Sequence, residues 1–224
     1  MKKSLAILTL FGAVSFGAAA STVWDVQGRK FSVDTLSHIE IGPGTTQTTL
    51  ALSGPADLRV FYTTTDMSNP NVGVKVIMGK DNLTSNVTVS QMPVTHTDPN
   101  NIYFAGVNSD FIGGMGPVGT TASNNVLYKT YKGHGWYAFG VDSNKKLYTG
   151  NTYSSFVFVC ADGSRAVINS VNTPRSDGEI VLYTSRKGSS TGTKRTGVEV
   201  AAVPVEGDLK SNGPTKMKNS GAPV

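Results

Sequence analysis

The part of this chain best suited to chemistry is a glycine-rich loop that follows a largely apolar segment, residues 102–111. The segment brings the amide of Asn108 and the carboxylate of Asp110 to the start of a loop with four glycines: Gly113, Gly114, Gly116 and Gly119. Glycines permit positive φ angles and let the backbone come close to a ligand. We therefore predict that Asp110 is a catalytic or substrate-orienting carboxylate. The alternative is that Asp110 only caps the loop through an Asx turn.

The same loop supplies the predicted substrate-binding groups. The amide of Asn108 is suited to bind a polar substrate, and equally suited to satisfy the backbone of the loop. The backbone N–H groups around Gly114 and Gly116 are suited to an anion. The loop lacks the lysine of a P-loop, so a plain turn is the alternative. Phe111 is expected to pack in the core rather than to serve as a binding platform.

Two further charged residues, Arg175 and Glu199, lie later in the chain. Arg175 follows Pro174 in a turn between two predicted strands, where its guanidinium would bind an oxyanion bidentately or remain a solvated surface group. Glu199 lies in the predicted strand 198–203. A glutamate that points inward would have a raised pKa and suit a general acid, whereas an outward one would be an ordinary surface residue.

Neither a metal site nor a cofactor is predicted. The three histidines, His38, His96 and His134, are far apart and share no metal-ligand spacing. The only cysteine, Cys160, excludes an internal disulfide. Because Cys160 ends the apolar run 156–159, we expect a buried and unreactive thiol.

Residues 1–20 have the charged, apolar and small-residue regions of a secretory signal peptide. We expect a mature chain that begins near Ser21 and is secreted or periplasmic. No later segment has the roughly 18 apolar residues of a transmembrane helix. The formal net charge of +5 is spread along the chain, so no nucleic-acid partner is expected.

Segments rich in Val, Thr, Phe and Tyr, separated by turn residues, predict a chain made mainly of strands. The expected strands cover residues 48–52, 58–64, 72–78, 126–129, 136–141, 155–159, 165–171, 180–184 and 198–203. One short helix is expected at residues 86–92, ahead of Pro93, with Asp81, Thr84 or Ser85 as its cap. The expected fold is α+β, a β-rich mixed sheet with few short helices.

Several short motifs occur in an order that resembles the phosphodiester glycosidase family, a secreted domain shared by bacterial proteins and the mammalian lysosomal uncovering enzyme. The central one is the glycine, valine, asparagine, small residue, aspartate and phenylalanine of residues 106–111. The others are residues 41–44, 58–62, 79–81, 116–119, 138–142, 172–175, 182–184, 190–193 and 197–199.

The resemblance implies hydrolysis of the glycosidic bond of a sugar 1-phosphodiester, which leaves the free sugar and a phosphomonoester. It implies Asp110 and Glu199 as catalytic residues, because glycosidic cleavage commonly uses two carboxylates. The implied substrate-binding residues are Asn108, Arg175, Gly114 and Gly116. The alternative is a noncatalytic carbohydrate-binding or surface module on the same scaffold. The sequence leaves the sugar, the phosphate substituent and the oligomeric state open.

The resemblance also divides the chain. Residues 21–100 would form an N-terminal β-rich region, and residues 101–205 the N-terminal half of the catalytic domain. In the family a second half follows, with an arginine–threonine motif and a glycine-rich motif that this sequence does not reach. We therefore expect an incomplete, inactive fragment, with a tail at residues 206–224 that is too polar to order itself.

Overall fold

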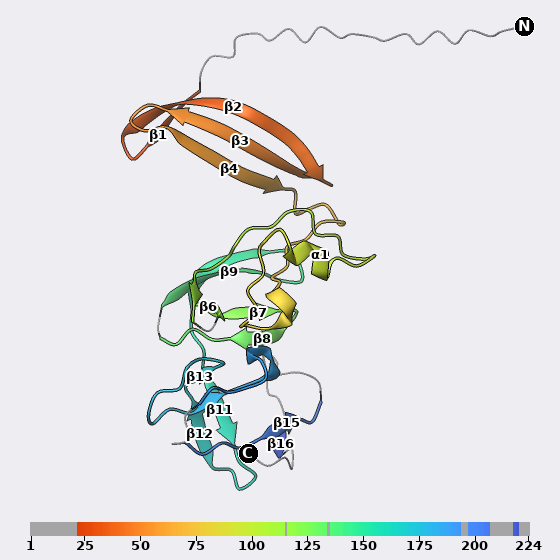
Figure 1. The fold of residues 1–224 in the computed structure, drawn as a ribbon, viewed down its shortest axis with the longest axis vertical. Helices are drawn as coiled ribbons and strands as arrows, with labels where there is room; N and C mark the ends of the chain where they lie inside the picture. Colours follow the sequence, from red (N-terminus) through yellow and green to blue (C-terminus); the bar gives the residue numbers. More distant parts are fainter. Residues whose placement is uncertain (1–21, 115, 134, 194–196, 207–216, 220–224) are drawn as a thin grey trace, which may run out of the picture. The chain divides into compact units, whose positions relative to one another are not determined.

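The computed structural model describes residues 22–114, 116–133, 135–193, 197–206 and 217–219, and these form two compact units divided after Asn69. Strands account for most of the regular structure, and the helices are short (Figure 1). The β-rich α+β fold class is therefore confirmed. The division after Asn69 differs from the expected boundary near residue 100. The expected signal peptide lies outside the described residues.

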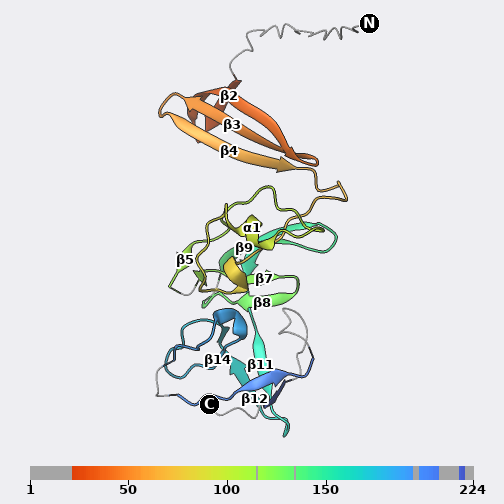
Figure 2. The same cartoon turned by 45° about the vertical axis from the view of Figure 1, so that its right-hand side comes forward.

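The first unit contains a four-stranded antiparallel sheet in the order β1-β2-β3-β4, whose curvature is visible in Figures 1 and 2. Its strands are β1 (Thr22–Val26), β2 (Arg29–Gly42), β3 (Thr45–Ser53) and β4 (Leu58–Thr65). Phe31 and Val33 on β2 form a buried cluster with Leu50 and Leu52 on β3, and Val60 packs against it. Because strand side chains alternate between faces, the alternate positions on β2 and β3 give this sheet one apolar face.

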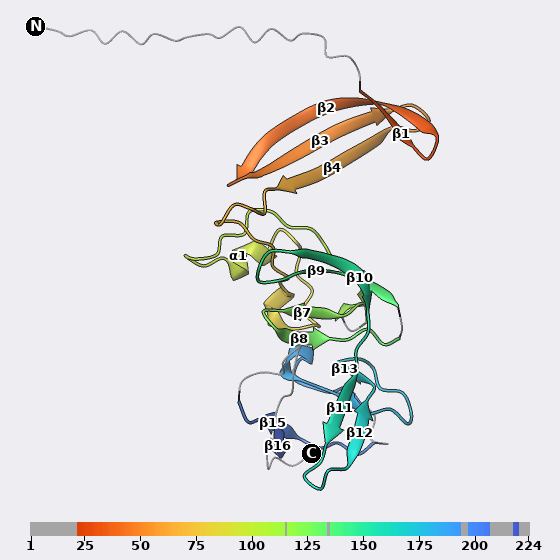
Figure 3. The same cartoon turned by 180° about the vertical axis from the view of Figure 1, so that it is seen from behind.

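The second unit is built from two-stranded pairs rather than one continuous sheet. The hairpins are β5 (Ile112–Gly113) with β6 (Gly116–Pro117), β7 (Thr121–Ser123) with β8 (Val126–Lys129), β9 (Trp136–Val141) with β10 (Leu147–Thr152), and β11 (Phe156–Val159) with β12 (Arg165–Ile168). Figure 3 shows β7 to β12 from behind. β13 (Ser170–Val171) and β14 (Val181–Leu182) pair in parallel, and β15 (Ala202–Pro204) pairs with β16 (Met217–Asn219) in antiparallel.

The helices differ from the sequence prediction. The α-helix α1 spans Met92–His96, with Pro93 in its first turn, and does not cover residues 86–92. Proline fits the first turn of a helix because the N–H that it lacks has no intrahelical partner there. None of the three predicted caps is used, since the residue before the helix is Gln91 and it makes no side-chain cap. Two 3-10 turns, η1 (Gly79–Asp81) and η2 (Ser185–Lys187), complete the unit.

Several strand and burial predictions need correction as well. Residues 72–78 form no strand. The run that ends at Cys160 does form β11, but most of its residues are exposed, and so is Cys160. Residues 217–219 lie in the tail that was expected to be disordered, yet they pair with β15. The rest of residues 207–224 lies outside the described residues.

A small apolar core holds the second unit together. Met78, Leu83 and Tyr128 form a buried cluster, against which Val126 packs. The backbone N–H of Leu83 donates to the carbonyl of Arg186 at 2.8 Å, which joins the segment after η1 to η2. Among the described residues, no helix is long and apolar enough to cross a membrane.

Candidate functional site

The carboxylate of Asp110 closes the glycine-rich loop. Its Oδ1 accepts a hydrogen bond from the backbone N–H of Phe111 at 2.7 Å, and its Oδ2 accepts one from Gly119 at 2.5 Å. Between these two residues the chain forms the β5–β6 hairpin, and Val118 N–H donates to the Phe111 carbonyl at 3.0 Å. We call residues 110–119 the Asp110 loop. Both carboxylate oxygens serve its backbone, which is the capping arrangement that the sequence left as the alternative.

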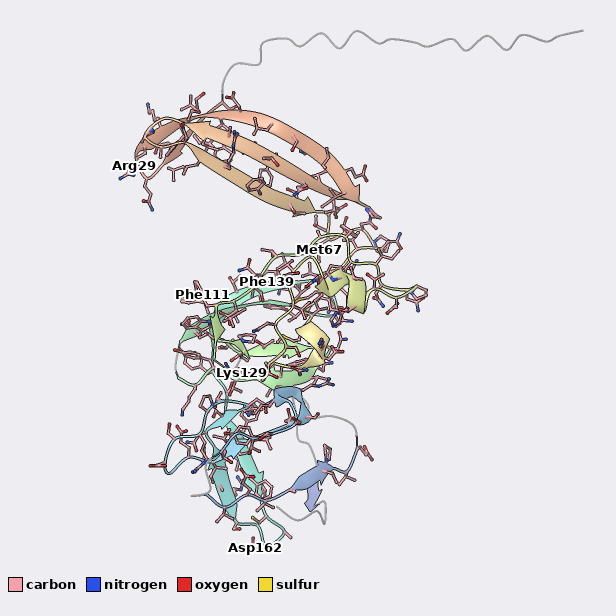
Figure 4. The ribbon with its side chains drawn as sticks, in the orientation of Figure 1. Arg29, Met67, Phe111, Lys129, Phe139 and Asp162 are labelled. Atoms are coloured by element: carbon pink, nitrogen blue, oxygen red, sulfur yellow. The ribbon has the colours of Figure 1, made fainter. Side chains whose placement is uncertain are left out.

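A buried lysine reinforces the Asp110 loop from β8. The Lys129 ammonium donates to the carbonyl of Pro117, and the side chain is buried (labelled in Figure 4). Burial lowers the pKa of Lys129, and the charge of Asp110 acts in the opposite direction. A Cβ on Gly119 would lie 2.7 Å from the Trp136 ring and 3.0 Å from Asp110 Oδ2. Glycine is therefore required at position 119 by close packing around the carboxylate.

The other residues predicted in this loop do not gather around a ligand-sized space. Asn108 is exposed. A Cβ on Gly116 would lie 2.5 Å from the Leu83 carbonyl oxygen, so this glycine faces the chain itself, whereas Gly114 faces open space. Phe111 is 76% exposed, so the expectation that it packs in the core was wrong (Figure 4).

Arg175 lies close to the segment that carries Glu199, since a Cβ on Gly197 would lie 3.0 Å from the Arg175 guanidinium, but the ion pairs among the described residues do not include these two groups. The Arg175 charge helps to lower the pKa of Glu199. Burial raises the pKa of Tyr183; a hydrogen bond to the backbone of Arg175 and the Arg175 charge lower it, and the Glu199 charge raises it further. Thr191 donates to Glu199 Oε1 at 3.0 Å, and Thr193 donates to the same oxygen. We call these five residues the Arg175 cluster: Arg175, Tyr183, Thr191, Thr193 and Glu199.

Glu199 does not lie where a general acid needs it. β15 begins only at Ala202, and Glu199 is exposed, so the predicted strand 198–203 is wrong for residues 198–201. The hydroxyls of Thr193 and Thr191, together with the Arg175 charge, hold the pKa of Glu199 below its usual value. Hydrogen bonds donated to the ionised form favour it. Glu199 is therefore a stable carboxylate at neutral pH rather than a proton donor.

The turn that carries Arg175 is fixed by polar contacts on both sides. Asn172 is fully buried at a φ of 54°, and its Nδ2 donates to the Tyr128 carbonyl at 2.6 Å and to Thr184 Oγ1 at 2.7 Å. Its Oδ1 accepts from Thr184 N–H at 2.8 Å. Because every polar atom of the Asn172 amide has a partner, this contact holds β8, β13 and η2 in one arrangement.

On the exposed side of that turn, Lys132 makes three contacts. Its ammonium donates to the Pro174 carbonyl at 3.0 Å and to Ser176 Oγ at 2.7 Å, and pairs with Glu179 at 2.7 Å. These contacts flank Arg175 in sequence. They fix the backbone from which the guanidinium extends.

A hollow of about 200 Å³ adjoins the Arg175 cluster. We call it the Lys187 hollow, and its lining consists of Tyr183, Thr184, Ser185, Lys187, Gly188, Ser189, Ser190 and Thr191. It shares Tyr183 and Thr191 with the Arg175 cluster.

A second hollow of about 210 Å³ contains Lys75, Asp81, His96 and Arg186, and there His96 Nε2 lies 3.5 Å from Asp81 Oδ1. In the part of the chain that the structure describes, no group of three His, Cys, Asp or Glu side chains is placed to hold a metal ion.

The structure thus brings Arg175 and Glu199 together, and it places Asp110, Gly114 and Gly116 in a separate loop whose charged neighbour is Lys129. Sequence reasoning assigned no role to Tyr183, Thr191, Thr193 or Lys187, although the first three lie in the short motifs at residues 182–184 and 190–193. The glycine, serine and threonine content of residues 188–193 was the available signal. The burial of a lysine beside such a loop depends on tertiary packing and has no local signature.

Comparison of the chain with models of protein families, with curated proteins and with solved structures finds no match. The resemblance to phosphodiester glycosidases therefore rests on the sequence motifs alone.

Proposed function

We propose that this chain belongs to an exported hydrolase that cleaves the glycosidic bond of a sugar 1-phosphodiester and binds this substrate at the Arg175 cluster. The observation that carries the proposal is a half-buried guanidinium and an ionised carboxylate in one cluster beside a hydroxyl-lined hollow. Guanidinium groups recognise phosphate oxygens through paired hydrogen bonds. A carboxylate stabilises the positive charge that develops on the sugar carbon during glycosidic cleavage.

The proposed reaction breaks the bond between the anomeric carbon and the phosphate oxygen. Water adds to the carbon, its proton passes to a base, and the phosphomonoester leaves with the bonding electron pair. Because the departing phosphate is already a stable anion, the reaction needs less acid assistance than ordinary glycoside hydrolysis. The ionised Glu199 therefore suits the role of a base or of a charge-stabilising group, and Arg175 that of the phosphate ligand.

Asp110 remains the second predicted catalytic carboxylate. Its two backbone hydrogen bonds give it a structural role whether or not it takes part in chemistry. The proposal does not depend on Asp110, because the charged groups that support it lie in the Arg175 cluster.

The direct test is to incubate the full chain with a panel of sugar 1-phosphodiesters and to measure release of free sugar. Arg175→Lys keeps the charge but loses the planar fork, so we expect KM to rise about 10-fold with a smaller change in kcat. Arg165→Lys on β12 is the matched control and should behave like the unsubstituted chain. Binding and cleavage that are both indifferent to Arg175→Lys would overturn the phosphate role of Arg175, and failure to cleave any member of the panel would count against hydrolysis.

A second candidate function is noncatalytic glycan binding, which one surface favours. Tyr137 and Phe139 on β9 are 75% and 56% exposed, and Thr149 and Asn151 lie directly opposite on β10. Alternate strand residues share a face, so the two rings and the two polar side chains form one surface. Aromatic faces beside hydrogen-bonding groups suit sugar rings. Glycan binding that is lost in Tyr137→Ala, without any turnover, would favour this candidate over the hydrolase.

A further inference from the structure

Lys187 is a buried cation that the proposed reaction does not use. The residue is 9% exposed, and its ammonium donates to the carbonyl of Ser190 at 2.7 Å and lies 5.4 Å from the centre of the Tyr183 ring. The two ion pairs among the described residues join His96 to Asp81 and Lys132 to Glu179, so no carboxylate of that part of the chain pairs with Lys187. Burying an ammonium without a counter-ion is costly, because the charge loses its hydration. Consistent with this, burial lowers the pKa of Lys187.

The walls of the hollow around this cation offer donors. Ser185 and Ser189 line the space, and neither hydroxyl has a hydrogen-bond partner among the described residues. Gly188 and Gly192 have φ angles of 126° and 65°, conformations that allow the loop to curve around the ammonium. A Cβ on Gly192 would lie 3.4 Å from Lys187 Nζ. The hollow therefore combines one positive charge, free hydroxyls and a tightly curved backbone, and none of its lining residues is acidic.

We infer that the Lys187 hollow is an oxyanion site that binds the phosphate group of a small phosphate ester. A phosphate offers several strong acceptor oxygens, which match the remaining ammonium protons of Lys187 and the hydroxyls of Ser185 and Ser189. Its charge offsets the cost of keeping the ammonium out of water. The inference concerns binding alone and does not rest on the proposed hydrolysis.

Inorganic phosphate is the simplest probe. We expect a titration of the isotope-labelled full chain with phosphate to give saturable NMR shifts centred on the backbone amides of residues 184–192. Lys187→Met should weaken phosphate binding at least about 10-fold, because it removes the charge and keeps the apolar stem. Lys146→Met is the matched control, since the Lys146 ammonium also lies over a tyrosine ring, 5.2 Å from the centre of Tyr148, but on an exposed side chain. The control should bind phosphate like the unsubstituted chain.

The shift map of the unsubstituted chain decides the matter even if Lys187→Met does not fold. Shifts that are absent, or centred on residues other than 184–192, would overturn the site. Equal affinity for acetate would overturn the assignment to phosphate, whereas tighter binding of phosphate than of acetate supports it. Because the measurement needs no turnover, a chain that binds phosphate at residues 184–192 and cleaves nothing would keep this inference and lose the proposed hydrolysis.

Discussion

The Asp110 loop and the Arg175 cluster each hold a carboxylate in a glycine-containing loop, but the donors to the two carboxylates differ. Asp110 accepts from the backbone N–H groups of Phe111 and Gly119. Glu199 accepts from the side-chain hydroxyls of Thr191 and Thr193. A backbone N–H in a hairpin cannot turn away without breaking the loop, whereas a hydroxyl can rotate toward an incoming ligand.

The cations near the two carboxylates also differ, since one is buried and the other is partly exposed. The cation near Asp110 is Lys129, which is buried and donates to the Pro117 carbonyl of the same loop. The cation near Glu199 is Arg175, which is only half-buried and belongs to the cluster that shares Tyr183 and Thr191 with the Lys187 hollow. One carboxylate thus maintains a loop, and the other is exposed and accepts from hydroxyl groups. A carboxylate in a motif that suggests catalysis can instead hold the backbone of its own loop in place. Hydrogen bonds from backbone N–H groups to the carboxylate distinguish this structural role from a functional one.

The largest effect that follows from this comparison is on turnover. Glu199→Gln keeps the size of the side chain and removes its charge, so we expect kcat for a sugar 1-phosphodiester to fall about 100-fold, which is typical for the loss of a positioned acid–base group. The measurement is steady-state release of free sugar. Glu206→Gln, at another exposed glutamate, is the control and should leave kcat unchanged. Full activity of Glu199→Gln would show that the Glu199 carboxylate takes no part in catalysis.

Asp110→Asn should act mainly on stability. The amide weakens two charge-assisted hydrogen bonds, so we expect the free energy of unfolding to fall by about 1.5–3 kcal/mol. Urea denaturation measures this loss, with the exposed Asp177→Asn as the control. A variant that unfolds like the unsubstituted chain but loses turnover about 100-fold would reverse the comparison and make Asp110 a catalytic residue.

Gly119→Ala tests the close packing around the Asp110 carboxylate. The added methyl group would meet Trp136 at 2.7 Å, closer than real contacts allow, so we expect a destabilisation of about 1–2 kcal/mol. Thermal unfolding followed by tryptophan fluorescence reports on both the stability and the surroundings of Trp136. At Gly140 on β9 a Cβ would meet nothing within 4 Å, which makes Gly140→Ala the matched control. If the two variants were equally stable, tight packing around Asp110 would be refuted.

The sequence predicted local features better than their surroundings. β8 and β9 have the predicted bounds, because short runs rich in Val, Tyr and Phe between turn residues are a local signal. The long strand β2 was not predicted, since a register shift between Thr35 and Ser37 interrupts the alternation of apolar and polar residues. The α-helix was displaced because Pro93 was treated as a stop and instead occupies the first turn.

In the candidate site, too, the sequence predicted local features better than their surroundings. The residue types of Arg175 and Glu199 were readable in the sequence, and so was the turn around Arg175. The raised pKa expected for an inward-facing Glu199 did not follow, because the hydroxyls that donate to it come from residues 191 and 193, in a loop whose path the sequence does not specify. The exposure of Cys160 and the burial of Lys187 likewise depend on packing between distant segments.

The smallest predicted effect concerns Lys132, which pairs with Glu179 and holds the turn that carries Arg175. Such a partly exposed ion pair contributes about 0.2–1 kcal/mol, so Lys132→Met should lower the free energy of unfolding by that amount at pH 7. The hydrogen bond from Lys132 is the main cause that lowers the pKa of Glu179 from its ordinary value of 4.5. A depressed carboxylate pKa stabilises the fold above the unfolded-state pKa, and this contribution is lost as the pH falls through the folded-state pKa.

The difference in stability between Lys132→Met and the unsubstituted chain should therefore be present at pH 7 and shrink toward zero as the pH falls well below 4.5. Urea denaturation across this pH range measures it, with the exposed Lys80→Met as the control whose effect stays flat. A difference that persists unchanged in acid would mean that the hydrogen bonds of Lys132 to Pro174 and Ser176, rather than the charge of Glu179, hold the turn. Arg175 would then owe its position to neutral acceptors, and the Arg175 cluster would keep its geometry at acid pH.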